Sequence, residues 1–190
     1  MSDPFLEIGP VRTEQDAMKE SIGSAVKVRN GTVVYRKGAD EKNKANFRSK
    51  WAGLIRRESQ LYVRPAQPIS DIQHCDAIRR ISDDQSNSFR ELLRDGELRN
   101  GISQKAFNLY LKYLWRLGKA VLPPHCPVDG VVLRAGAILG SWTDNNSEKE
   151  YMDWINRLRA KASNQGLSLS EWEYRVWLDD YLQRGSSKCS

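Results

Sequence analysis

The segment that decides the fold spans residues 100–118 and reads NGISQKAFNLYLKYLWRLG. Its apolar side chains recur every three or four positions from Ala106 to Leu117, which is the spacing of one face of an α-helix. We expect Ser103 to cap the start of this helix and Gly118 to end it. The polar side chains fall on the opposite, outward side: Lys105, Asn108, Lys112 and Arg116.

The same periodicity predicts further helices along the chain. They cover residues 46–60, Ser70 to Ile81, 86–94, Asp129 to Leu139, 147–163, and a last helix from Ser168 or Ser170 to about Arg184. The three prolines of residues 123–127 predict an extended segment, because proline disrupts a helix interior. Asn30-Gly31 between β-branched residues is typical of a tight turn and predicts a β-hairpin over 25–36. The expected fold class is mainly α, with this small N-terminal β-hairpin.

Composition limits the class of protein. Of the 190 residues, 39% are hydrophobic and 28% charged, which allows a buried core and argues against a disordered chain. The apolar runs are far shorter than the roughly 20 residues that cross a bilayer, and no secretory signal is visible. We therefore expect an intracellular protein, in the cytoplasm or nucleoid, without membrane contact and most simply monomeric. It would form one compact unit over 1–190, comprising an N-terminal segment (1–64), a helical core (65–184) and a tail (185–190).

Positive charge is concentrated in one part of the chain. Residues 27–64 contain eleven Lys/Arg against three Asp/Glu, whereas residues 144–180 contain five against eight, and the whole chain carries a formal charge of +6. This asymmetry indicates a cationic face that binds a polyanion, most simply double-stranded DNA. A solvated surface on a mildly basic protein is the alternative.

The three cysteines, Cys75, Cys126 and Cys189, do not indicate disulfides or an iron–sulfur cluster, which needs four ligands. Two His-Cys dipeptides, at 74–75 and 125–126, could together supply four zinc ligands, but adjacent residues on a helix point in different directions. Buried thiols beside ordinary histidines are the better interpretation. We expect no metal and no organic cofactor.

Two short motifs carry the candidate chemistry. Residues 101–105, Gly-Ile-Ser-Gln-Lys, open the segment quoted above, and Val128-Asp129 follows 24 residues after Lys105. A helix, a Gly-containing turn and a second helix expose backbone N–H groups that bind an anion such as a DNA phosphate. We therefore expect DNA contacts from six residues: Gly101, Ile102, Ser103, Gln104, Lys112 and Arg116.

This pair of motifs resembles the helix-hairpin-helix DNA glycosylase superfamily, which includes endonuclease III and the 8-oxoguanine glycosylases, in its branches without an iron–sulfur cluster. Gly101, Ile102 and Lys105 are similar to its hairpin, over about 92–118, and Val128-Asp129 to its catalytic aspartate motif. The resemblance covers residues 92–139. It implies that Lys105 is the amine nucleophile of a glycosylase with AP lyase activity and that Asp129 is its essential carboxylate.

The chemistry requires both residue types. Breaking a glycosidic bond develops positive charge on the sugar, which the carboxylate of Asp129 would stabilise. Lys105 would attack C1′, release the base and form a Schiff base. Because an ordinary lysine is neutral only about 0.04% of the time at pH 7, we expect burial or nearby cations such as Lys112 and Arg116 to lower its pKa.

The sequence therefore predicts a DNA glycosylase that flips a damaged or modified base out of the duplex and excises it, in DNA repair or in defence against foreign DNA. Candidates for the base pocket are Trp115, His125 and Trp142, although aromatic residues at helical spacing generally face a core. The hairpin over 25–36 and the basic helix over 47–57 would hold the DNA backbone. The alternatives are a noncatalytic helix-hairpin-helix DNA-binding or adaptor module, and a helical protein-interaction domain.

Overall fold

The computed structural model describes residues 11–27 and 33–186, and the regular secondary structure within them is helical. The α-helices are α2 (Glu14–Val26), α3 (Glu41–Ser59), α4 (Asp71–Phe89), α5 (Asn100–Arg116), α6 (Gly130–Ala135), α7 (Glu148–Ser163) and α8 (Leu169–Ser186). Two 3-10 helices, η2 (Gln60–Tyr62) and η3 (Arg94–Gly96), lie between them. The mainly α fold class is confirmed for this part of the chain. None of the helices described is both long and apolar enough to span a membrane.

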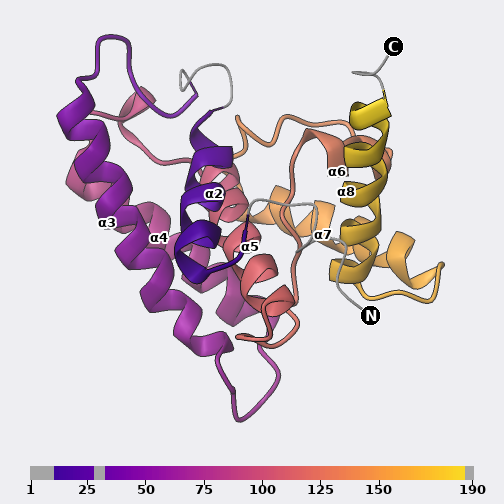
Figure 1. Ribbon diagram of the computed structural model, residues 1–190. Helices are drawn as coiled ribbons and strands as arrows, with labels where there is room; N and C mark the ends of the chain where they lie inside the picture. Colours follow the sequence, from indigo (N-terminus) through magenta and orange to yellow (C-terminus); the bar gives the residue numbers. More distant parts are fainter. Residues whose placement is uncertain (1–10, 28–32, 187–190) are drawn as a thin grey trace.

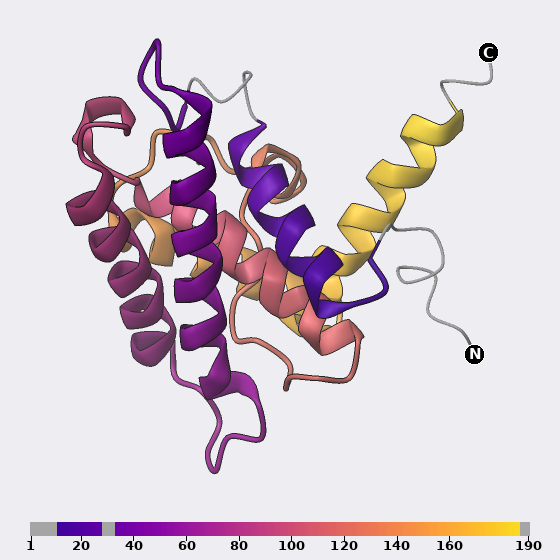
Figure 2. The ribbon, with the colours of Figure 1, turned by 60° about the vertical axis from the view of Figure 1, so that its left-hand side comes forward.

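Helix α5 lies at the centre of the molecule (Figure 1). Helices α2 and α4 pack along it on one side, with α3 beside α4, and α6, α7 and α8 lie on the other side. Figure 2 shows the same arrangement after a rotation, with α3 and α8 again on opposite flanks. Because elements cover α5 on both sides, its side chains from Gly101 to Leu114 are all buried.

Helix α5 begins earlier than the sequence predicts. Arg99 occupies the N-cap position, so the expectation that Ser103 caps the helix is wrong. Ser103 lies inside the helix, and its buried hydroxyl donates to the carbonyl oxygen of Ile78 on α4. The expected end is confirmed, because Gly118 follows the helix with a φ of 70° that other residues rarely adopt.

The expected β-hairpin over 25–36 is wrong in the part that the structure describes. Helix α2 continues through Ala25, whose side chain is fully buried on the apolar face of that helix. In the second half of the range, Tyr35 forms an isolated antiparallel bridge with Leu93 and no hairpin strand. Asn30-Gly31, on which the expectation rested, lies outside the described residues.

Ser70 caps helix α4 as expected, in a reciprocal capping box with Gln73. The helix continues to Phe89 instead of ending at Ile81. The separate short helix expected over 86–94 is therefore wrong, since its first turn is the end of α4. No proline or glycine interrupts α4, so nothing in its backbone stops the helix at the expected point.

The connection from α4 to α5 makes its tight turn at Asp95-Gly96, where both residues have positive φ. Ser82 and Ser86 of α4 hold this connection, because their side-chain oxygens bond the carbonyl and the N–H group of Leu98. The turn between the two helices therefore precedes Gly101, which was expected to form it and instead lies within α5.

The proline-containing segment over 123–127 is free of helix, as expected, and leads to the short helix α6. Asp129 caps α6 as predicted. The helix ends at Ala135 rather than at Leu139, because the backbone of Ala137 turns to a φ of 54°. Leu139 is 96% exposed.

The starts of the last two helices are confirmed. Ser147 caps α7 through the N–H group of Glu150. At α8, the hydroxyl of Ser168 accepts from the N–H group of Glu171, and the Glu171 carboxylate accepts from the N–H group of Ser168. Such reciprocal bonds satisfy backbone donors that a helix start otherwise leaves unpaired.

Candidate active site

The structure brings Lys105 and Asp129 together. Nζ of Lys105 lies 2.5 Å from Oδ2 of Asp129. Lys105 belongs to the second turn of α5, and Asp129 is the residue immediately before α6. Their side chains are 11% and 24% exposed, so the pair lies at the edge of the core, where solvent still reaches it.

Asp129 has a second role at the start of α6. Its Oδ1 accepts from the N–H groups of Val131 and Val132, while Oδ2 faces Lys105. Burial acts to raise the pKa of Asp129, but the charge and hydrogen bond of Lys105, together with the two N–H donors, outweigh it and hold the pKa below its ordinary value. The carboxylate is therefore ionised and fixed in orientation at neutral pH.

A second lysine of α5 forms a buried ion pair with α8. Nζ of Lys112 lies 2.7 Å from Oε2 of Glu173, and the two side chains are 2% and 5% exposed. Burial lowers the pKa of Lys112 and raises the pKa of Glu173, and the partner's charge opposes the shift in each case. Lys105 and Asp129 also act on the pKa of Glu173, lowering and raising it respectively, so the four groups form one electrostatic cluster.

The outward polar face expected for α5 is wrong, because neighbouring elements enclose the helix. Lys105, Asn108 and Lys112 are buried, and Arg116 is half-buried with its guanidinium 4.9 Å from the ring centroid of Trp115. Five of the six residues expected to contact DNA are buried: Gly101, Ile102, Ser103, Gln104 and Lys112. Arg116 alone among the six reaches the surface in this conformation.

The backbone N–H groups at the start of α5 are not open to a phosphate. The N–H of Asn100 donates to Oδ1 of Asn146 at 3.1 Å, and the N–H of Gly101 donates to the carbonyl oxygen of Asn145 at 2.9 Å. The loop is so close that a Cβ on Gly101 would lie 1.7 Å from the carbonyl oxygen of Trp142. The expected phosphate anchor is therefore covered by this loop.

His125, expected in a base pocket, is instead fully buried in a hydrogen-bonded network. Its Nδ1 lies 2.8 Å from the hydroxyl of Tyr151, and its Nε2 lies 3.0 Å from Oδ1 of Asp71. His74 lies against it, and both nitrogens of that ring are hydrogen-bonded as well. Neither histidine can therefore face a base.

Within the described ranges, no group of three or more His, Cys, Asp or Glu residues is placed to hold a metal ion.

Trp142 is the aromatic candidate that lies beside the pair. Its indole Nε1 would lie 4.0 Å from a Cβ built on Gly130, the residue that follows Asp129. The Trp142 side chain is half-buried, so one part of the indole remains accessible. Trp115 is also half-buried but lies near the far end of α5, beside Arg116.

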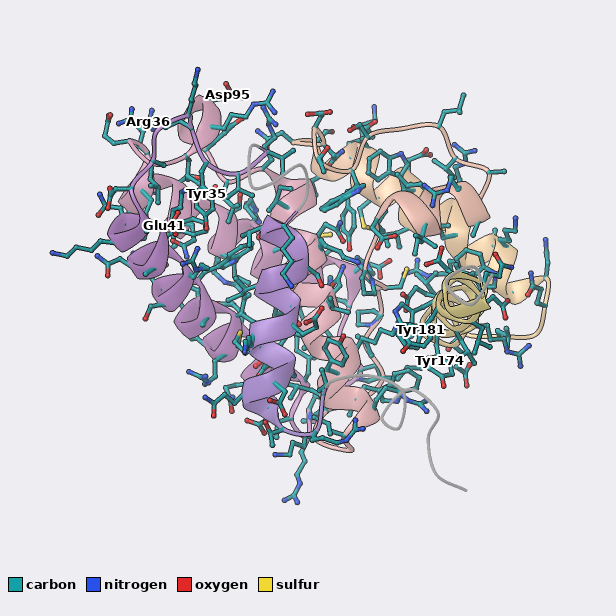
Figure 3. All side chains as sticks on the ribbon, turned by 45° about the horizontal axis from the view of Figure 1, so that its top comes forward. Tyr35, Arg36, Glu41, Asp95, Tyr174 and Tyr181 are labelled. Carbon is teal, nitrogen blue, oxygen red and sulfur yellow. The ribbon has the colours of Figure 1, made fainter. Side chains whose placement is uncertain are left out.

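An aromatic row on α8 lies next to the Lys112–Glu173 pair. The rings of Tyr174 and Trp177 stack with centroids 6.4 Å apart, and those of Trp177 and Tyr181 with centroids 5.3 Å apart. Nζ of Lys112 lies 5.3 Å from the Trp177 ring centroid. Figure 3 shows Tyr174 and Tyr181 on α8, on the flank away from the labelled residues of the N-terminal half. The Tyr174 ring centroid lies 6.0 Å from Nζ of Lys112, so two rings of this row cover the ion pair.

The basic helix α3 was expected to hold the DNA backbone beside the lesion, but it does not lie next to the Lys105–Asp129 pair. Figure 1 places it on the flank opposite α6 and α8, and Figure 2 again shows it apart from α8. Several of its basic side chains are exposed: Lys42, Lys50, Arg56 and Arg57. Lys50 and Arg57 share an acidic partner, Asp84, at 3.5 and 3.4 Å. The cationic surface and the candidate site are therefore separate features.

Sequence reasoning missed Glu173 and misjudged the surroundings of Gln104. Glu173 lies 61 positions after Lys112, and periodicity within one helix cannot reveal a partner on another. One signal was present in the sequence: Glu173 stands four residues before Trp177, on the same face of α8.

Comparison with protein-family models, with curated proteins and with solved structures gives no match for this chain.

Proposed function

We propose that the protein is a DNA glycosylase that removes a damaged or modified base and cleaves the strand through an AP lyase step. The observation that carries the proposal is the 2.5 Å contact between Nζ of Lys105 and Oδ2 of Asp129 at the edge of the core. An amine nucleophile and an oriented carboxylate are the two groups that this chemistry requires. The likeness of Lys105 and of Val128-Asp129 to the catalytic positions of helix-hairpin-helix glycosylases supports the same function.

In the proposed reaction, the C1′–N bond breaks and its electron pair leaves with the base. Nζ of Lys105, in salt-bridge contact with Asp129, first gives one proton to the departing base. Asp129 meanwhile stabilises the positive charge on the sugar. The neutral amine then bonds to C1′, and the C1′–O4′ bond opens as a second proton passes from Nζ to O4′, leaving an iminium link between protein and DNA.

Other residues near the Lys105–Asp129 pair have different roles in the proposed reaction. Lys112 takes no direct part in the proposed reaction, because its charge is paired with that of Glu173. Trp142, beside Gly130, is the side chain on which a flipped base would stack. Arg116, half-exposed near the end of α5, would contact a phosphate.

Borohydride trapping tests the proposal, because borohydride reduces an iminium link to a stable covalent adduct. The protein is incubated with duplexes that each carry one oxidised, alkylated, deaminated or hypermodified base, and adducts are separated by mass. The matched variants are Lys105→Ala and Lys105→Arg, the second of which keeps the charge beside Asp129 but provides no nucleophile. Lys119→Ala, which removes an exposed lysine paired with Glu14, is the control for loss of one positive charge.

We expect an adduct with at least one duplex for the unchanged protein and for Lys119→Ala, and none for either Lys105 variant. Base release without strand cleavage that survives in Lys105→Arg but not in Asp129→Asn would assign a monofunctional glycosylase. Absence of both adduct and released base from every duplex would reject the enzyme.

A noncatalytic DNA-binding module is the second candidate, and the exposed basic surface of α3 favours it. Lys42, Lys50, Arg56 and Arg57 lie along one exposed helix, and each phosphate that such residues neutralise releases counterions. The test is a titration of labelled duplex at two salt concentrations. Arg56→Ala should reduce the salt slope by about one if α3 holds DNA, whereas a protein-interaction domain shows no salt-dependent binding.

A further inference from the structure

The side chain of Gln104 holds the backbone of Val128, the residue immediately before Asp129. Its Nε2 donates to the Val128 carbonyl oxygen at 2.6 Å, and its Oε1 accepts from the Val128 N–H group at 3.1 Å. These two bonds resemble the pair of N–H···O=C bonds that a residue exchanges with its partner on a neighbouring antiparallel strand. Here one side-chain amide makes both of them. Among residues 11–27 and 33–186, no strand pairs with the 123–129 segment, so Gln104 supplies the donor and acceptor that a sheet would otherwise provide.

All the hydrogen-bonding capacity of this amide is used. Nε2 also donates to the carbonyl oxygen of Gly101 at 2.9 Å, and Oε1 also accepts from Nδ2 of Asn108 at 3.1 Å. A side-chain amide offers two donor hydrogens and two acceptor lone pairs, and here each has a partner. Gln104 is fully buried, so its orientation is fixed by its partners and not by solvent.

Asn108 supports the same segment from the next turn of α5. Its Nδ2 donates to the carbonyl oxygen of Cys126 at 3.0 Å, two residues before the bond that Gln104 makes. Its Oδ1 lies 2.7 Å from Nε2 of His74, which ties α4 to the same point. The segment is therefore held at alternate residues, Cys126 and Val128, and both supports come from the helix that carries Lys105.

We propose that Gln104 is a positioning residue for Asp129, and that it sets the distance between the carboxylate and the amine of Lys105. Gln104 precedes Lys105 on α5, and Val128 precedes Asp129 on the segment, so one pair of hydrogen bonds fixes the backbones of both partners. The catalytic role inferred for Gln104 rests on the proposed glycosylase function, whereas its role in setting the distance between Lys105 and Asp129 does not. Holding reacting groups in place is a main source of rate enhancement, and a displacement of about 1 Å can cost 10²-fold.

The test compares Gln104→Met, which fills the space without hydrogen bonds, with Gln85→Met. Gln85 is a matched control, because it is also a fully buried glutamine that donates to a backbone carbonyl, that of Phe47, far from the site. In each background, a double-mutant cycle with Lys105→Met and Asp129→Asn measures the coupling of this pair in urea unfolding at neutral pH. The cycle separates the pairwise contact from general loss of stability.

We expect the Lys105–Asp129 pair to change the unfolding constant about tenfold in the unchanged protein and in Gln85→Met. In Gln104→Met the coupling should fall to less than twofold. If the role of Gln104 were purely structural, both Gln104→Met and Gln85→Met would lower the stability and leave the Lys105–Asp129 coupling intact. That result would overturn the proposal.

Gln104→Glu provides a second variant in case Gln104→Met does not fold. A neutral carboxylic acid has one O–H donor and a carbonyl acceptor, so it can make both bonds to Val128, whereas the ionised form has no donor. Burial at this fully enclosed position raises the pKa of a carboxyl. The coupling should therefore resemble that of the unchanged protein at about pH 5, where the acid is neutral, and decrease towards pH 8. A coupling that does not vary with pH in this variant contradicts the assignment.

Single-turnover base release adds the catalytic measurement. On a duplex that the unchanged protein cleaves, Gln104→Met should lower the single-turnover rate constant at least tenfold. The protein concentration that gives half of that rate should change less than twofold, because orientation and not DNA affinity is lost. If the unchanged protein releases no base from any duplex, the proposed function fails, while the double-mutant cycle still decides whether Gln104 positions Asp129.

Discussion

The imidazole rings of His74 and His125 lie against each other in the core, with centroids 4.2 Å apart, and neither is exposed to solvent. Burial lowers the pKa of both rings, and the nearby His125 lowers that of His74 further. Asp71, at the surface end of the network, opposes the shift of His125 through its hydrogen bond but does not reverse it. Both rings are therefore neutral in the folded protein at pH 7.

This arrangement predicts that stability falls as the pH decreases below about 6.5. A histidine in the unfolded chain has a pKa near 6.5, and the folded values of His74 and His125 lie below it. Their contribution is complete above the unfolded value and is lost as the pH falls towards the folded values, by up to about 1.4 kcal/mol per pH unit for each histidine. Urea unfolding between about pH 5 and pH 8 measures this slope.

The control for the pH effect is His74→Gln, which keeps polar contacts but removes one titrating ring. Its stability should depend on pH about half as steeply as that of the unchanged protein between pH 5 and 6.5. Asp71 adds a separate acid loss, because its hydrogen bond with His125 and the two bonds of Arg159 lower its pKa. That part should appear only below about pH 4. An unchanged slope in His74→Gln is incompatible with the assignment.

The buried pair of Lys112 and Glu173 predicts an asymmetry between single and double substitution. Lys112→Met leaves a buried carboxyl without its partner and should destabilise the fold by about 3–5 kcal/mol. The double variant Lys112→Met/Glu173→Leu removes both charges and should recover most of that loss. Lys119→Met is the exposed comparison, since its partner Glu14 is 48% exposed, and should cost at most about 1 kcal/mol. Urea midpoints measure all three, and equal losses in the Lys112 and Lys119 variants would contradict the burial.

Two glycines within helices predict opposite effects of substitution by alanine. At Gly101 the added Cβ would overlap the carbonyl oxygen of Trp142, so Gly101→Ala should destabilise the protein by about 1–3 kcal/mol. At Gly53 of α3 nothing lies within 4 Å of the added atom, and Gly53→Ala should stabilise it by about 0.5–1 kcal/mol. Thermal unfolding of the two variants distinguishes the sites, and a loss at Gly53 as large as at Gly101 would argue against the close approach.

The sequence was sufficient for most helices but not for the environment of the central one. Capping residues such as Ser70 and Asp129 act within four residues of the chain, so a local pattern reveals them. The enclosure of Lys112 depends on α8, whose position relative to α5 no local pattern contains. The apparent hairpin over 25–36 failed for the related reason that tertiary packing of α2 continues the helix through Ala25 and the β-branched Val26.

The pairing of Lys105 with Asp129 could be predicted because a motif linked the two positions before any geometry was known. The support from Gln104 could not, since an amide in the polar positions of a helix resembles a solvent-exposed residue until its partner segment is placed. The phosphate anchor failed for the same reason, because Asn145 and Asn146 take the donors that the turn was expected to offer.

If the glycosylase proposal holds, removal of the Trp142 indole should slow base release. Its half-buried indole lies beside Gly130, next to the Lys105–Asp129 pair, where it can replace the stacking that a flipped base loses. Stacking on an aromatic side chain contributes about 1–3 kcal/mol, so Trp142→Ala should slow single-turnover base release about 5- to 150-fold, while Trp142→Phe retains most of the rate. Trp115→Ala, which removes an equally half-buried indole near the far end of α5, should leave the rate within about twofold. Equal losses in Trp142→Ala and Trp115→Ala would indicate a general effect on the core and remove Trp142 from the base pocket.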